Sequence, residues 1–197
     1  MAKSSPTGIS TKTRLAITGV FGGICASAAL FSIIVVPLPG IPGGSGYWIP
    51  AALYFALTFW FGIYGALAGH IGTFFGMGPF FGFTFQVWAD GALGDFFAPI
   101  IGWGIFRGVF KADPELKTRK DWVAWIVSVP IATFLASMWI HSVNFAFGTI
   151  TFGAWVWGVI SYTIGDSLAV FTLGTLILKT ASKWVKTSPF YMEGLFK

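Results

Sequence analysis

The chain has 197 residues, of which 55% are apolar and only 10% carry a charge, and its mean hydropathy is +0.78. A soluble domain of this size needs about 25% charged residues to face water, so the composition excludes a soluble globular protein and indicates a lipid-facing surface. The net charge of +5 would suit nucleic-acid binding, but the clustered positions of the basic residues argue against it.

The basic residues form three clusters, separated by two stretches (15–106 and 121–178) that contain no Lys or Arg. The clusters are Lys3, Lys12 and Arg14; Arg107, Lys111, Lys117, Arg119 and Lys120; and Lys179, Lys183, Lys186 and Lys197. Cytoplasmic loops of membrane proteins collect Lys and Arg, whereas translocated loops exclude them. We therefore expect all three clusters to lie on the cytoplasmic side of a membrane.

The apolar segments between the clusters predict an all-α bundle of six transmembrane helices. A helix needs about 20 residues to cross the hydrocarbon core, so the uncharged run Tyr47–Ala89 must fold back, with a tight reversal near Gly62. The predicted spans are Leu15–Pro37, Tyr47–Phe61, Ile63–Gly78, Gln86–Val109, Trp122–Val143 and a sixth within Thr151–Lys179. Six spans place both ends of a single membrane domain (1–197) and its hydrophilic loop (110–121) in the cytoplasm.

Small residues form stripes on two of these predicted spans, at the spacing of three and four residues that marks one helix face. On the third span they are Gly62, Gly65, Gly69, Gly72 and Gly76, a pattern that favours close packing within the protein. On the first span they are Gly19, Gly22, Gly23, Ala26 and Ala29. For this second stripe, packing within the protein and docking on a partner subunit are both open.

Three carboxylates, Asp90, Asp95 and Asp166, are predicted to lie within or beside the bilayer. A carboxylate near the centre of a membrane helix costs about 2.5–3.5 kcal/mol on insertion scales, so such groups normally face a bundle interior or a watery cavity. Each of these carboxylates could bind a ligand, or could have a structural role only, as a helix cap or as an acceptor of hydrogen bonds from neighbouring side chains.

Other polar and aromatic side chains share predicted helix faces with these carboxylates. Aromatic rings beside carboxylates suit a flat organic ligand, including a cationic one, although most of the ten Trp also fit an interfacial belt. The candidate substrate-binding residues are Trp88 and Asp95 on the fourth span; His141 and Asn144, which continue the face of Ser137, on the fifth; and Trp155, Tyr162 and Asp166 on the sixth.

No enzyme motif is present in the sequence: GxSxG, HExxH and GxxxxGK[ST] are all missing, so we expect no catalytic activity. The two histidines, His70 and His141, lack metal-ligand spacing, and we expect neither a metal nor another cofactor. His70 is expected to hydrogen-bond a neighbouring residue. Without a nucleotide-binding motif the chain cannot power transport by itself.

Four segments resemble the substrate-binding membrane subunits (S components) of energy-coupling factor transporters. They are the stripe from Gly19 to Ala29, FGIYGALAGHIGTFFG at 61–76, ADGALGDFFAPIIGWGIFRGVFK at 89–111 and GDSLAVFTLGTLILK at 165–179. The resemblance covers most of the chain from Leu15 to Lys183.

The resemblance implies a multi-pass subunit of a prokaryotic cell membrane that takes up a vitamin-like micronutrient. It implies a substrate pocket near the outer face, covered by loop 37–46. The stripe of the first span would dock on a transmembrane coupling subunit driven by two ATPases, and transport would proceed by toppling of the whole subunit. The AxxxA-type docking motif of the family is only approximated here, by Gly22 and Ala26 or by Gly19 and Gly23. The sequence lacks a His-rich N-terminus, which disfavours a metal substrate.

Two other functions remain open: a structural or accessory subunit of a larger membrane complex, and a stand-alone carrier whose carboxylates relay ions or protons. A transporter subunit should copurify with a small molecule, whereas an accessory subunit should bind nothing small. Uptake by a proton-linked carrier should depend on a pH gradient rather than on ATP.

Overall fold

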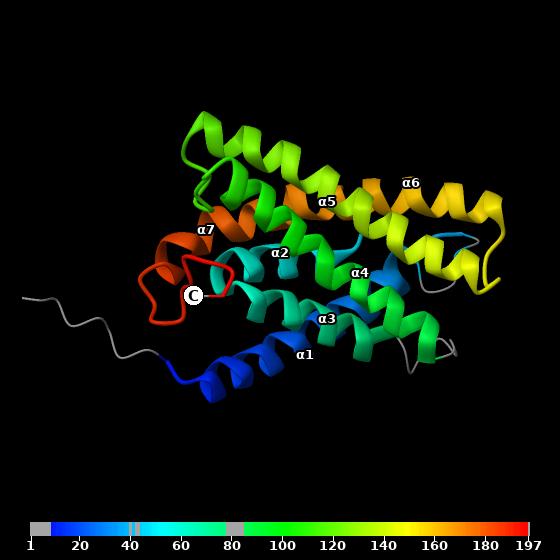
Figure 1. The fold of residues 1–197 in the computed structure, drawn as a ribbon, viewed down its shortest axis with the longest axis horizontal. Coiled ribbons are helices and arrows are strands. Elements are labelled where there is room, and N and C mark those ends of the chain that lie inside the picture. The colour runs from blue at the N-terminus through cyan, green and yellow to red at the C-terminus, as the bar shows by residue number, and fades with distance from the viewer. Residues whose placement is uncertain (1–8, 40, 42–43, 78–84, 197) are drawn as a thin grey trace, which may run out of the picture.

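The computed structural model describes residues 9–39, 41, 44–77 and 85–196, and for residues 85–90 it describes the backbone alone. The described chain is all-α, which confirms the predicted class. Its helices are α1 (Thr11–Val35), α2 (Ile49–Phe61), α3 (Ile63–Met77), α4 (Phe85–Trp103), α5 (Arg119–Ala146), α6 (Phe152–Ala169) and α7 (Thr175–Val185). Two π-helical segments, η2 (Gly104–Val109) and η3 (Val170–Gly174), extend α4 and connect α6 to α7. The helices lie side by side in one bundle (Figure 1).

Within the described chain, three helices are long and apolar enough to cross a membrane: Thr11–Val35, Arg119–Ala146 and the continuous helix Phe152–Val185. The helix α2 is apolar but has only 13 residues. Large apolar side chains also cover the outside of the bundle; Ile34 on α1, for example, is 75% exposed. An apolar outer surface of this extent is unfavourable in water. Together these features indicate a multi-pass membrane protein.

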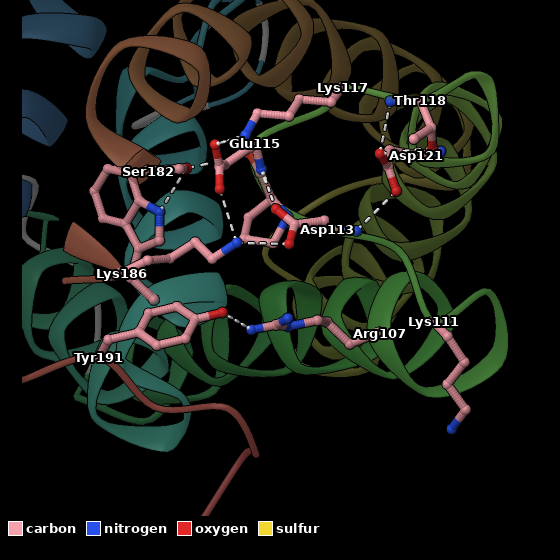
Figure 2. A network of polar contacts seen from close by, with 12 residues as sticks. Arg107, Lys111, Asp113, Glu115, Lys117, Thr118, Asp121, Ser182, Lys186 and Tyr191 are labelled. Carbon is pink, nitrogen blue, oxygen red and sulfur yellow. Dashed lines mark hydrogen bonds and ion pairs between the residues drawn. The ribbon is translucent and has the colours of Figure 1, made fainter. Parts of the chain in front are cut away.

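Polar side chains fix where several helices begin. The Thr118 hydroxyl group accepts a hydrogen bond from Asp121 N at 3.2 Å, and the Asp121 carboxylate accepts one from Thr118 N at 2.8 Å (Figure 2). This capping box satisfies backbone N–H groups at the start of α5. The helices α1 and α6 have simpler caps. The Ser10 side chain accepts a hydrogen bond from Thr13 N, and the Thr151 side chain accepts one from Ala154 N.

The hairpin of α2 and α3 forms the centre of the bundle, and glycine makes it possible. Gly62, between the two helices, has a φ of 57°, which favours glycine because other residues meet a steric penalty there. One turn later, a Cβ at Gly65 would overlap the backbone of Leu57 and Thr58. The two helices can therefore lie this close only because position 65 has no side chain.

The small residues of α1 divide between two faces. Gly22 packs against the side chain of Ile71 on α3, and the Cα of Ala26 and the Cβ of Ala29 pack against Gly76. Gly19 and Gly23, by contrast, have no described atom within 4 Å of the position of a Cβ. Packing within the protein thus accounts for one part of the stripe, and the other part faces outward.

The end of the bundle that carries the hydrophilic loop is closed by ion pairs (Figure 2). The Lys186 ammonium group, just after α7, lies 2.7 Å from Asp113 Oδ2 and 2.8 Å from Glu115 Oε1, and Lys117 pairs with the other oxygen of Glu115. Hydrogen bonds from Lys117 and Lys186 hold the pKa of Glu115 below its ordinary value. These pairs tie loop 110–118 to the end of α7.

Segment 187–196 folds back across the same end of the bundle and meets the turn between α2 and α3. Leu195 O accepts a hydrogen bond from Ile63 N at 2.8 Å. The Met192 sulfur lies 3.4 Å from a guanidinium nitrogen of Arg14 on α1. Residues far apart in the chain therefore complete this end of the bundle together.

Candidate ligand-binding site

A cavity of about 60 Å³ lies between α3, α4, α5, α6 and the segment that precedes α2. It has room for several water molecules or for the head group of a small organic molecule. The described residues that line it are Ile41, Trp48, Thr73, Met77, Gly91, Ala92, Asp95, Ile140, His141, Asn144, Thr149, Ile150 and Tyr162. Four of the seven predicted substrate-binding residues are among them: Asp95, His141, Asn144 and Tyr162.

Asp95 is the only carboxylate among the described lining residues, and it is 4% exposed. Three neutral donors hold it in place. Trp48 Nε1 donates to Oδ2 at 3.3 Å, Thr73 Oγ1 donates to Oδ2 at 2.7 Å, and Tyr54 OH donates to Oδ1 at 3.0 Å. An indole N–H can only donate, so Oδ2 is necessarily an acceptor. Donors aimed at both oxygens fix the orientation of the carboxylate.

The α2–α3 hairpin supplies all three of these donors. Trp48 directly precedes α2, which begins next to Pro50, a residue that suits the first turn of a helix. Tyr54 lies one turn into α2, and Thr73 lies on the facing helix α3. Asp95 comes from α4, which packs against this hairpin. A polar centre is therefore built from helices that are otherwise apolar.

The segment that precedes α2 lies next to the cavity and is tied to the bundle. Ser45 Oγ donates to Ser32 O of α1 at 2.9 Å, and Gly46 N donates to Val36 O at 2.8 Å. This second bond closes the segment into a short antiparallel hairpin. The hairpin brings Ile41 into the cavity wall.

The end of α5 forms the opposite wall. His141 Nδ1 lies 2.8 Å from Ser137 O, and because a carbonyl oxygen can only accept, Nδ1 carries the proton. The His141 ring meets the Tyr162 ring edge-on, with centroids 4.6 Å apart. Gly158 allows α6 this close approach, since a Cβ there would overlap the imidazole ring. Asn144 donates to Ile140 O at 2.8 Å.

Three of the predicted substrate-binding residues are not part of this described wall. Asp166 is 3% exposed but does not line the cavity, and its Oδ1 has no hydrogen-bond partner among the described residues. Trp155 stacks on Phe152 and donates to Ser142 Oγ at 3.2 Å, near the α5–α6 turn. Trp88 lies in α4, but its side chain, like that of Asp90, is outside the described part of the structure.

Sequence reasoning missed the three donors to Asp95, namely Trp48, Tyr54 and Thr73. The only signal was the position of Trp48 directly before Ile49-Pro50, where an interfacial Trp is equally common. His70 hydrogen-bonds as predicted, through Nδ1 to Ala92 O at 2.9 Å. Within the described residues, no group of three or more His, Cys, Asp or Glu side chains is placed to hold a metal ion.

No protein-family model, curated protein or solved structure matches this chain. Its function is therefore best approached through the chemistry of the cavity.

Proposed function

We propose that this chain is the substrate-binding membrane subunit of an uptake transporter for a small, vitamin-like organic molecule. The observation that carries the proposal is the cavity itself, a partly enclosed space in an apolar bundle with one oriented, buried carboxylate. Concave sites with mostly apolar walls and a few fixed polar groups are typical of small-molecule binding. The resemblance of four segments to S components of energy-coupling factor transporters supports the same function.

The position of the cavity along the bundle also supports uptake. The helix α5 begins at Arg119, beside the basic hydrophilic loop, and reaches the cavity at His141 and Asn144, near its other end. If basic loops lie in the cytoplasm, the cavity opens toward the outer face. In this proposal the bundle crosses the cell membrane of a prokaryote six times, and both ends of the chain are cytoplasmic.

Gly19 and Gly23 on the outward face of α1 support docking on another membrane protein. Small residues four apart let a second helix approach closely in lipid. We propose that this face contacts a transmembrane coupling subunit, whose two ATPases supply the energy. Gly22, Ala26 and Ala29 pack against α3, so they would hold α1 in place while its outward face contacts the partner.

The proposed topology predicts which residues a reagent can reach from outside the cell. Cys25 is buried, and in a Cys25→Ser background single cysteines can be placed at exposed sites. We expect a membrane-impermeant maleimide to label Thr149→Cys in intact cells, and to label Lys117→Cys only after the cells are permeabilised. The reverse pattern would contradict both the topology and the outward position of the cavity.

A side chain that fills the cavity should prevent binding without disturbing the fold. Gly91 lines the cavity, and a Cβ there would have no described neighbour within 4 Å. We expect purified wild-type protein to retain a small molecule, detectable by native mass spectrometry, and Gly91→Leu to retain none. The matched control is Gly104→Leu, at a position that also has open space but does not line the cavity; it should retain the molecule.

Two results would contradict the proposal. One is a wild-type protein that retains nothing after exposure to a cell extract; this would favour an accessory subunit. The other is equal retention by wild type and Gly91→Leu, which would place the molecule elsewhere.

A further inference from the structure

We infer that the cavity selects a small organic cation whose N–H group donates a hydrogen bond to Oδ1 of Asp95. The inference rests on the proposed function and names the substrate class of the same site. It follows from three features of the cavity: the acceptors left open, the missing positive charge and the space beside the carboxylate.

The first feature is an unfilled acceptor position on Asp95. A carboxylate has about four lone-pair positions for hydrogen bonds, two on each oxygen. Oδ2 already receives Trp48 and Thr73, whereas among the described residues only Tyr54 donates to Oδ1. This count leaves one acceptor position of Oδ1 without a donor among the described residues. Because the three protein donors hold the carboxyl group still, a ligand meets an acceptor of fixed direction.

The second feature is the missing positive charge. Every described residue that lines the cavity comes from the two stretches, 15–106 and 121–178, in which the sequence has no Lys or Arg. The three donors to Asp95 are neutral. His141 directs its Nδ1 proton to Ser137 O, and its ring is packed between Gly158 and Tyr162. No Lys or Arg of the described wall therefore pairs with the carboxylate. His70 of α3 lies outside that wall; it interacts with Asp95 through space, without a hydrogen bond, and directs Nδ1 to Ala92 O.

An unpaired charge in a membrane interior is costly, and a ligand that brings the opposite charge removes that cost. An anionic ligand would add repulsion at close range. A neutral donor would fill the open position of Oδ1 but leave the charge uncompensated. A quaternary ammonium ion would compensate the charge but could not donate to Oδ1. An ammonium or comparable N–H cation meets both requirements.

The third feature is the shape of the space beside Asp95. A Cβ at Gly94 of α4 would overlap the Ile140 side chain of α5, so Gly94 and Ile140 lie at the same level along the bundle. Asp95, the next residue of α4, is therefore farther from the α5–α6 turn than Thr149 is. Ile41, Ile140 and Ile150 line the wall with apolar atoms. A volume of about 60 Å³ admits a small head group at this depth. The aromatic rings of Trp48 and Tyr162 also favour a cation.

A matched series of small probes tests the inference. Propylammonium chloride, propan-1-ol and sodium propanoate have similar size and differ in head-group charge, and tetramethylammonium chloride carries charge without an N–H. Binding to the purified full chain is measured by saturation-transfer NMR at constant ionic strength. A saturation-transfer signal that wild type gives and Gly91→Leu does not is assigned to binding in the cavity, because the leucine side chain fills the cavity.

We expect propylammonium to bind wild type at least about tenfold more tightly than any of the other three probes. In Asp95→Asn this preference should shrink to within about threefold, while propan-1-ol still binds and so shows that the cavity is intact. Asn can keep the local hydrogen bonds, with its oxygen accepting from Trp48 and Thr73 and its amide donating to the Tyr54 oxygen.

Equal or tighter binding of propan-1-ol or propanoate to wild type would overturn the cation inference, and so would a preference for propylammonium that survives in Asp95→Asn. Tetramethylammonium binding as tightly as propylammonium would overturn the role of the N–H donor. In each of these cases the proposed function stands, because the probes still need the cavity. If no probe distinguishes wild type from Gly91→Leu, the cation inference fails, and the proposed function is then decided by whether wild type retains a molecule in native mass spectrometry.

Discussion

Gly65→Ala is expected to destabilise the folded protein strongly, although it adds a single methyl group. The new Cβ would overlap backbone atoms of Leu57 and Thr58, which cannot rotate aside as a side chain would. Relief would require α2 and α3 to separate at the centre of the bundle. Overpacking of this kind costs about 3 kcal/mol, a large part of the 5–15 kcal/mol that stabilises a typical protein. The yield of monodisperse protein after detergent extraction and its Tm should both fall.

The matched control for this prediction is Gly23→Ala, which makes the same change in another apolar helix. A Cβ at position 23 has no described neighbour within 4 Å, and alanine favours a helix over glycine by about 1 kcal/mol. We expect the Tm of this variant to equal or exceed that of wild type. Equal Tm values for Gly65→Ala and wild type would show that the hairpin does not need its close helix contact.

Asp95→Ala and Asp166→Ala are expected to change stability in opposite directions. Removal of the Asp95 carboxylate leaves the buried donors of Trp48, Tyr54 and Thr73 without an acceptor. Each unsatisfied buried group costs about 1–3 kcal/mol, so we expect a loss of about 3 kcal/mol and a Tm about 6–12 °C lower. Asp166→Ala removes a buried oxygen that has no partner, and the Tm should rise by about 2–4 °C.

The same pair of variants separates structural from binding roles. Thermal unfolding without ligand measures the first, and retention of the copurifying molecule measures the second. A fall in Tm for Asp166→Ala would mean that the carboxyl group stabilises the bundle in a way the described contacts do not show. A rise in Tm together with loss of the retained molecule would place Asp166 in the ligand site, as its helix face predicts.

The fold class could be predicted from the sequence because lipid imposes simple constraints. Long apolar runs without charge must be helical in a bilayer, and the gaps in the Lys and Arg distribution mark where the runs lie. The close packing of α3 could be predicted for a similar reason, since Gly65, Gly69 and Gly72 share one face. These signals are local in sequence, and no knowledge of neighbouring helices is needed to find them.

The polar centre could not be predicted, because its members are not local. The donors to Asp95 lie 22, 41 and 47 residues away, and nothing in Trp48, Tyr54 or Thr73 indicates which acceptor each will meet. The helical period indicates which face of a helix a residue occupies, but not how far along the bundle the residue lies. Trp155 and Asp166 share a face, but about 16 Å of helix separates them, so Trp155 lies near the α5–α6 turn while Asp166 is buried within the bundle.

The contact of segment 187–196 with the α2–α3 turn bears on the order in which the protein assembles. Arg14 and Met192, which meet at this end, are separated by 178 positions, and Ile63 receives its backbone partner from Leu195. During synthesis the central hairpin therefore enters the membrane long before the residues that complete its turn exist. Until then the hairpin lacks these contacts, and the final closure is a late, non-local step that loop-closure entropy slows.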